Sequence, residues 1–212
     1  MRKINFIIFF ALILINNLFF LDLQSAIKNK IIVKVGETLI TSLDIRNEII
    51  TSLVLNRQEL NQENIDKRKN LSVQNLISKS IKKNEISKYK IEKFNMDDLQ
   101  KYISEVSNKF NTDQNGLKKI FKDANIDYDT FLENHKTELL WNTLIFQIYR
   151  NQINVNIIEV DNELEKIKES KNKEELKKIR ENILSNKKSE KLSLFSRSHF
   201  SNLENTVNIS FQ

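Results

Sequence analysis

The stretch Ile31-Ile-Val-Lys-Val-Gly-Glu-Thr-Leu-Ile-Thr41 contains the features that decide the fold. A short apolar segment is followed by Gly36-Glu37 and then by a second apolar segment at residues 38–40. Because glycine readily adopts a positive φ, this spacing predicts a tight β-hairpin. Thr41 or Ser42 can then cap a helix, and Asp44 completes a capping-box pattern with Thr41. An isolated hairpin is only marginally stable in water, so a third strand or a helix must cover it.

A matching β signal lies near the other end of the chain. In residues 206–211, Val207, Ile209 and Phe211 alternate with polar residues, which is typical of one face of a strand. Neither this strand nor the hairpin is expected to be stable alone. We therefore expect them to pair, so that the two ends of the mature chain meet in one three-stranded sheet.

Between these strands, apolar residues recur mostly at the helical spacings of three and four. Residues 56–69 are expected to be a polar segment leading into the second helix, and residues 82–90 to be its solvated end. We expect a helix after Thr41, a second helix carrying Leu71 to Ile81, a third capped by Asn95, a short fourth opened by Thr112 or Asp113, a long fifth opened by Asp127, a charged helix through Val160, Leu164 and Ile167, and a last helix from Leu176 toward Leu192. The predicted fold class is mainly α, with many helices and one small sheet.

The composition excludes several classes of site. The 212 residues contain no cysteine, no proline and two glycines. A disulfide framework and a thiolate metal site are therefore excluded, as are the glycine-rich loops that bind nucleotides. The formal net charge is +6, but basic residues are interleaved with acidic ones. Because nucleic-acid binding requires a clustered basic patch, we expect no nucleic-acid partner.

Residues 1–26 have the pattern of a Sec-type signal peptide. Arg2 and Lys3 precede an apolar run from Ile4 to Leu21 that only asparagines interrupt, and a polar segment ending at Ala26 follows. The alternative is an uncleaved anchor, because about 20 apolar residues can span a bilayer. We expect export to the periplasm, with membrane contact only if the signal is retained.

Taken in order, several segments resemble the SurA-type periplasmic chaperones. Residues 31–41, leading through Asp44 into a helix, resemble the opening of that family, and residues 71–91 look like its second helix. Tyr128-Asp-Thr-Phe131, within residues 117–138, is similar to the entry to the family's long helix. Residues 150–163 look like the entry to the next helix, and residues 183–211 like the C-terminal helix and strand. The resemblance covers nearly all of the mature chain.

The resemblance implies a four-part organisation. In the family, one or two parvulin prolyl-isomerase domains usually precede the C-terminal helix, whereas here that place holds only the few residues around 169–173. We therefore expect a chaperone core without isomerase activity. Its parts would be a signal peptide at 1–26, a SurA-like N-terminal domain at 27–158, a connecting helix at 159–173 and a C-terminal helix and strand at 174–212.

The function that the resemblance implies is ATP-independent holding of unfolded chains, without enzymatic activity or a cofactor. The clients would be unfolded outer-membrane or secreted proteins, and the outer-membrane assembly machinery is a further expected partner. A different class of function remains open, namely a structural or assembly subunit, periplasmic or membrane-anchored, that docks one defined partner.

The fifth predicted helix is the richest in large apolar side chains. Residues 139–149 project them around most of the helix circumference, although a helix packed on one side needs only a stripe. One interpretation is a central helix wrapped by the hairpin and the other helices. The other is a surface that lines a groove for unfolded chains. The candidate client-binding residues are Leu140, Trp141, Leu144, Ile145, Phe146 and Tyr149.

Other polar residues give no catalytic pattern. His135 and His199 are the only histidines and lie far apart in the sequence, and Asp97-Asp98 is most simply the first turn of a helix. We therefore expect no catalytic residue, no metal site and no cofactor site.

Overall fold

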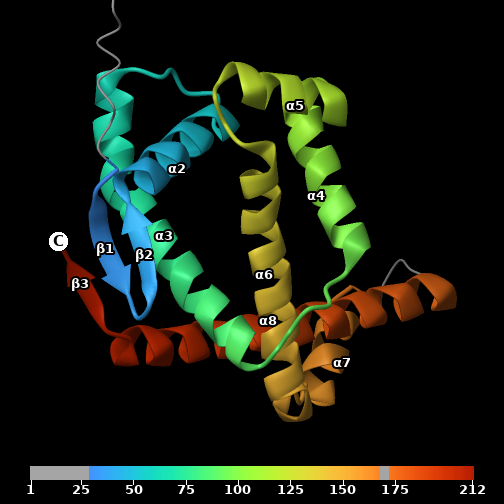
Figure 1. Cartoon of the computed structure of the whole chain (residues 1–212). Coiled ribbons are helices and arrows are strands. Elements are labelled where there is room, and N and C mark those ends of the chain that lie inside the picture. The colour runs from blue at the N-terminus through green and yellow to red at the C-terminus, as the bar shows by residue number, and fades with distance from the viewer. Residues whose placement is uncertain (1–28, 168–171) are drawn as a thin grey trace, which may run out of the picture. The chain divides into compact units, whose positions relative to one another are not determined.

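The computed structural model describes residues 29–167 and 172–212, so the predicted signal peptide or anchor at residues 1–26 lies outside the described residues. Within the described residues, strands β1 (Ile31–Val35), β2 (Thr38–Thr41) and β3 (Ile209–Phe211) form one sheet in the order β2-β1-β3 (Figure 1). Both pairings are antiparallel. The predicted pairing of the N-terminal hairpin with the C-terminal strand is confirmed.

The local signals around the hairpin are also confirmed. Gly36 has a φ of +56°, and its N–H donates a hydrogen bond of 2.9 Å to the carbonyl of Asn208, just before β3. Thr41 caps the next helix, and its N–H donates to the Asp44 carboxylate at 2.8 Å. The reciprocal bond from the Asp44 N–H to the Thr41 hydroxyl completes the capping box.

The rest of the described chain is helical, which confirms the mainly α fold class. Asn95, Asp113 and Asp127 each cap a helix, as the sequence predicts. The helices are α2 (Ser42–Leu55), α3 (Gln62–Lys88), α4 (Met96–Lys109), α5 (Gln114–Asp123), α6 (Tyr128–Tyr149), the 3-10 helix η1 (Arg150–Gln152), α7 (Ile157–Glu165) and α8 (Lys173–Thr206).

Helix α3 differs from the prediction at both ends. It begins at Gln62, because the Asn61 side chain caps it, so much of the expected polar segment at residues 56–69 is helical. At the other end, residues 82–90 were expected to be solvated, but Glu85 and Ile86 are buried. The prediction was wrong there because α6 and α8 pack over this end of the helix, which the local sequence pattern does not reveal.

The core consists of three clusters of buried side chains. The first joins the sheet to α2 and α3 through residues such as Val33, Ile49 and Ile81. The second joins α4 and α5 to the first turns of α6. The third joins the end of α3 to the last turns of α6, with half-buried side chains of α8 packed against it. Helix α6 therefore contributes to two of the three clusters.

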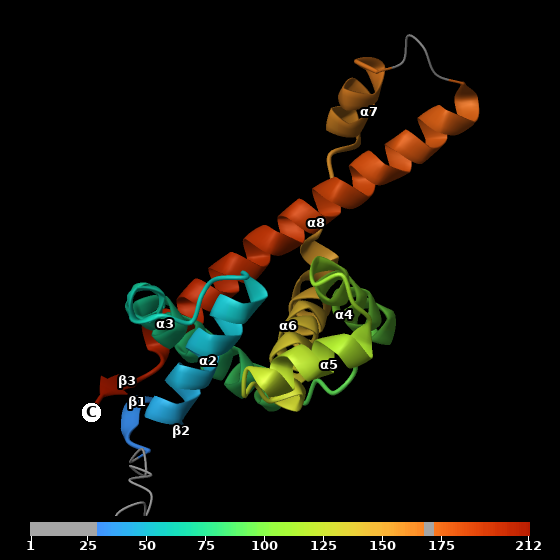
Figure 2. The ribbon, with the colours of Figure 1, turned by 90° about the horizontal axis from the view of Figure 1, so that it is seen from above.

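Helices α7 and α8 complete the described fold. Figure 2 shows α7 beside the N-terminal part of α8, whose other end passes α6 and α3 and leads into β3. Two ion pairs join α7 to α8: Arg180–Asp161 at 3.0 Å and Lys187–Glu163 at 2.7 Å. The predicted part boundaries at residues 158 and 173 stay predictions. None of the described helices is both long and apolar enough to span a membrane.

The burial of Val35 on the core face of β1 predicts that a polar atom at this position destabilises the fold. Val35→Thr keeps the side-chain size but places a hydroxyl at a fully buried position, so we expect a loss of roughly 1–3 kcal/mol in the free energy of unfolding. Lys34→Thr, at the neighbouring position that points to the opposite face, should change it by no more than about 0.5 kcal/mol. Urea denaturation measures both. Equal losses in the two variants would contradict the assigned core face.

Candidate functional site

The predicted client-binding residues on α6 divide into buried and accessible ones. Trp141, Leu144 and Ile145 are at most 2% exposed, whereas Phe146 is 50% exposed. Leu140 and Tyr149 are half-buried. Three of the six side chains therefore cannot contact a client while α8 is in place, and for them the structure favours the interpretation of a central helix. Client contact through the accessible ones stays a prediction.

Helix α8 covers α6 through directional contacts as well as apolar packing. The indole N–H of Trp141 donates a 2.8 Å hydrogen bond to the Ser196 hydroxyl. The Tyr149 ring stacks on Phe195, with a centroid distance of 4.7 Å and an interplanar angle of 2°. Phe200 meets the Trp141 ring edge-on. Because these contacts need a defined register, they fix where α8 crosses α6.

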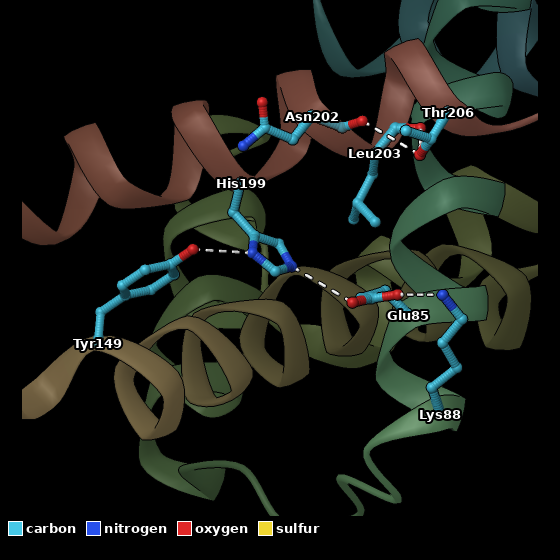
Figure 3. A network of polar contacts seen from close by, with 7 residues as sticks. All are labelled: Glu85, Lys88, Tyr149, His199, Asn202, Leu203 and Thr206. Atoms are coloured by element: carbon cyan, nitrogen blue, oxygen red, sulfur yellow. Dashed lines mark hydrogen bonds and ion pairs between the residues drawn. The ribbon is translucent and has the colours of Figure 1, made fainter.

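A buried polar network ties the same helices together (Figure 3). Glu85 of α3 is 5% exposed, and its carboxylate lies 3.4 Å from His199 Nε2 of α8 and 2.8 Å from the Lys88 ammonium. His199 Nδ1 lies 3.0 Å from the Tyr149 hydroxyl of α6. The hydrogen bond that the Lys88 ammonium donates to the Glu85 carboxylate raises the pKa of Lys88 above its usual value. The network is a structural contact among three helices.

The remaining candidate polar residues also have structural partners. His135 stacks on Tyr102, with ring centroids 3.5 Å apart. Asp97 and Asp98 occupy the first turn of α4, next to the cap residue Asn95, as predicted. Within residues 29–167 and 172–212, no group of three acidic or histidine side chains is placed to hold a metal ion.

An apolar groove lies between β1, α2 and α3. We call it the α2–α3 groove; its volume is about 610 Å³. Each helix contributes one face, because its lining residues follow the spacing of three and four that defines a helix face. The apolar lining residues are Ile32, Ile45, Ile49, Ile50, Leu60 and Ile65, and the polar ones are Ser42, Arg46, Gln62, Asp66 and Lys69.

The sequence pattern did not reveal this groove. In the sequence, Leu60 and Ile65 fall within the segment that was expected to be polar. In the structure, both line the apolar groove, where Leu60 is 51% exposed. The available signal was Asn61, which can cap a helix, followed by Gln62, Ile65 and Lys69 at helical spacing. Even with that signal, the crossing of α2 and α3 that opens the groove is not encoded locally.

A second cavity, of about 240 Å³, lies between α2 and α6; we call it the α2–α6 pocket. Its lining is polar and aromatic. Glu48 of α2 accepts a 2.7 Å hydrogen bond from Lys79 of α3, and Glu138 of α6 pairs with Lys82. The lining residues are Glu48, Thr51, Ser52, Leu55, Asn56, Lys79, Tyr102, Phe131, Asn134, His135 and Glu138.

Comparison with known proteins gives a distant structural likeness but no match to a family. No family model matches the chain, and no curated protein matches it. A similar solved structure belongs to Campylobacter jejuni, where the virulence factor PEB4 and the periplasmic protein Cj1289 are two structurally related SurA-like chaperones. It is 14% identical, the match covers 87% of this chain and 99% of that chain, and the TM-score is 0.43.

The indole contact leads to a stability prediction. Ser196→Ala leaves the buried Trp141 N–H without its acceptor, so we expect the free energy of unfolding to fall by about 1–3 kcal/mol. Ser198→Ala, at an exposed position on the same helix, is the matched control and should be nearly neutral. Thermal or urea denaturation distinguishes the two. A neutral Ser196→Ala would show that the indole contact does not hold α8 on α6.

Burial of His135 leads to a pH prediction. Desolvation lowers the pKa of His135 in the folded chain, although the nearby carboxylates of Glu138, Asp98 and Glu105 oppose this. Below about pH 6.5 the unfolded chain therefore binds more protons at this residue than the folded chain, and stability falls as the pH drops. His135→Phe keeps a ring on Tyr102 but does not titrate. We expect a shallower loss of stability between about pH 6.5 and pH 5 in this variant, measured by urea unfolding; an unchanged slope would contradict the assignment.

Proposed function

We propose that the chain is a periplasmic chaperone that holds unfolded outer-membrane or secreted polypeptides without ATP and without isomerase activity. The α2–α3 groove is the observation that carries this proposal. Its floor consists of isoleucine and leucine side chains, and the charged residues at its rim, Arg46, Asp66 and Lys69, include both signs. A lining of this kind favours apolar side chains of many sequences over one defined ligand.

The groove has a firm support for such binding. Helices α2 and α3 are held by the core, in which Leu53 and Ile81 are buried together with the groove residues Ile45 and Ile49. The groove therefore does not need to form when a client arrives, which lowers the entropic cost of binding. Affinity would come from apolar burial, at about 25 cal/mol per Å² of surface removed from water.

Other exposed apolar side chains lie on the same elements. Leu39 of β2, Leu43 of α2 and Leu71 of α3 are each at least 40% exposed. Clusters of exposed apolar surface commonly mark interaction sites. They support contact with an extended chain along several short segments, which suits weak and exchangeable holding.

The proposal predicts that residues 26–212 slow the aggregation of an unfolded outer-membrane β-barrel protein. Leu60→Arg places a charge in the apolar groove and should weaken client binding about three- to tenfold, because it removes one partly buried leucine contact. Met96→Arg is the matched control, since Met96 is similarly exposed (55%, against 51% for Leu60) but lies on α4 outside the groove. Light scattering and fluorescence anisotropy measure the two effects.

Two results would overturn the proposal: no effect of the wild-type chain on aggregation, or equal losses in Leu60→Arg and Met96→Arg. Capture of one stoichiometric partner, in place of varied unfolded chains, would instead indicate the structural or assembly subunit.

A further inference from the structure

The α2–α6 pocket contains polar groups that the fold leaves unpaired. Within the described part of the chain, the side chains of Asn134 and Thr51, the Tyr102 hydroxyl and the ring nitrogens of His135 have no hydrogen-bond partner. They converge on a cavity whose wall also includes the Phe131 ring. Water still reaches these polar atoms, since none of them is among the buried atoms without a partner. A ligand that supplies hydrogen-bond partners can therefore replace water in the pocket.

Three groups in this pocket can accept a hydrogen bond from a ligand. The Glu138 carboxylate gives one oxygen to Lys82, and its other oxygen has no partner among the described residues. Because burial lowers the pKa of His135, its ring is neutral at neutral pH and offers a lone pair. The amide oxygen of Asn134 is a third acceptor.

The charge around these acceptors is negative. Lys79 is neutralised by Glu48, with which it forms a 2.7 Å ion pair, and the Lys82 ammonium is paired with Glu138. Three carboxylates, those of Glu138, Asp98 and Glu105, act on His135. Glu138 pairs with Lys82 and Glu105 with Lys101, so Asp98 is the one of the three without an ion pair among the described residues. A cationic group entering the pocket would therefore meet a favourable field.

We propose that the α2–α6 pocket binds the side chain of an arginine. The guanidinium group is planar, carries five N–H donors and no acceptor, pairs with carboxylates and stacks on rings. The pocket offers the complementary set: the Glu138 carboxylate beside the parallel rings of His135 and Tyr102, which are 3.5 Å apart at an angle of 6°. A cavity of about 240 Å³ accommodates one side chain of this size.

The arginine would belong to a bound polypeptide, and this source rests on the proposed function. The pocket and the α2–α3 groove approach each other along the chain at the end of α2, since Leu55 and Asn56 line the pocket and Leu60 lines the groove. Because the α2 residues of the groove and of the pocket lie on different faces of that helix, a polypeptide that contacts both sites would have to cross this connection. The pocket would then add charge-dependent anchoring to the apolar binding of the groove.

The test uses the full chain, purified after export, and the probe N-acetyl-arginine N-methylamide. The chain has two histidines, so the imidazole NMR signals of His135 report on the pocket and those of His199 serve as an internal control. We expect a saturable shift of His135 alone. The citrulline analogue, which has nearly the same shape but no charge, should produce no saturable shift. Equal responses to both probes, or no response to arginine up to ~100 mM, would overturn the inference.

Two variants of pocket residues test the assignment of the pocket as an arginine site. Glu138→Gln removes the carboxylate charge and should weaken arginine binding about tenfold, whereas Glu133→Gln, on the same helix but outside the pocket, should leave it unchanged. Because Glu138→Gln also deprives Lys82 of its partner, a second variant is needed. Asn134→Asp adds a carboxylate at nearly constant size and should tighten binding; a weaker or unchanged affinity would contradict the proposal.

The outcome is separable from that of the proposed function. If the chain prevents client aggregation but the arginine probe leaves His135 unshifted, only the pocket assignment fails. If the probe binds and no client is held, the proposed function fails and the pocket remains a guanidinium site.

Discussion

The pairing of β1 with β3 is the contact on which the rest of the described structure depends. β1 is the central strand, and β3 occupies the edge that β2 leaves free. Because β3 follows α8 after only a short connection, the pairing holds the end of α8 against the helical body. Val33 and Val35 under the sheet, and the bond from Gly36 to Asn208, stabilise this arrangement. The sheet is small, yet it determines which helix covers α6.

The position of α8 is then set by polar contacts. Apolar burial is non-directional and would tolerate small shifts of one helix along another. The hydrogen bond from Trp141 to Ser196 and the one between His199 and Tyr149 each require one register. A buried polar group that lacks a partner destabilises the fold, so any displacement of α8 that breaks these contacts lowers the free energy of unfolding. The apolar side chains of α6 at residues 141, 144 and 145 are thereby committed to the core.

Because much of α6 is buried, the candidate binding surfaces lie along α2 and not along α6. Helix α2 packs on the sheet and α3, but two of its other faces line cavities of different chemistry. The α2–α3 groove is apolar with a mixed rim, and the α2–α6 pocket is polar with aromatic walls. The proposed roles differ accordingly: the groove would take apolar side chains of many sequences, and the pocket would take one cationic side chain.

Features encoded within a few residues could be predicted from the sequence. The hairpin at Gly36, the capping box at Thr41 and the caps at Asn95, Asp113 and Asp127 each depend on neighbours close along the chain, and the alternation at Val207 to Phe211 indicated the last strand. For Trp141 the sequence left burial and a client groove as two open interpretations. The burial of Glu85 at the end of α3, the groove at Leu60 and Ile65 and the pocket around His135 could not be predicted. They depend on which helices cross and at what angle, because an apolar period identifies the faces a helix must bury but not the partner that covers each one.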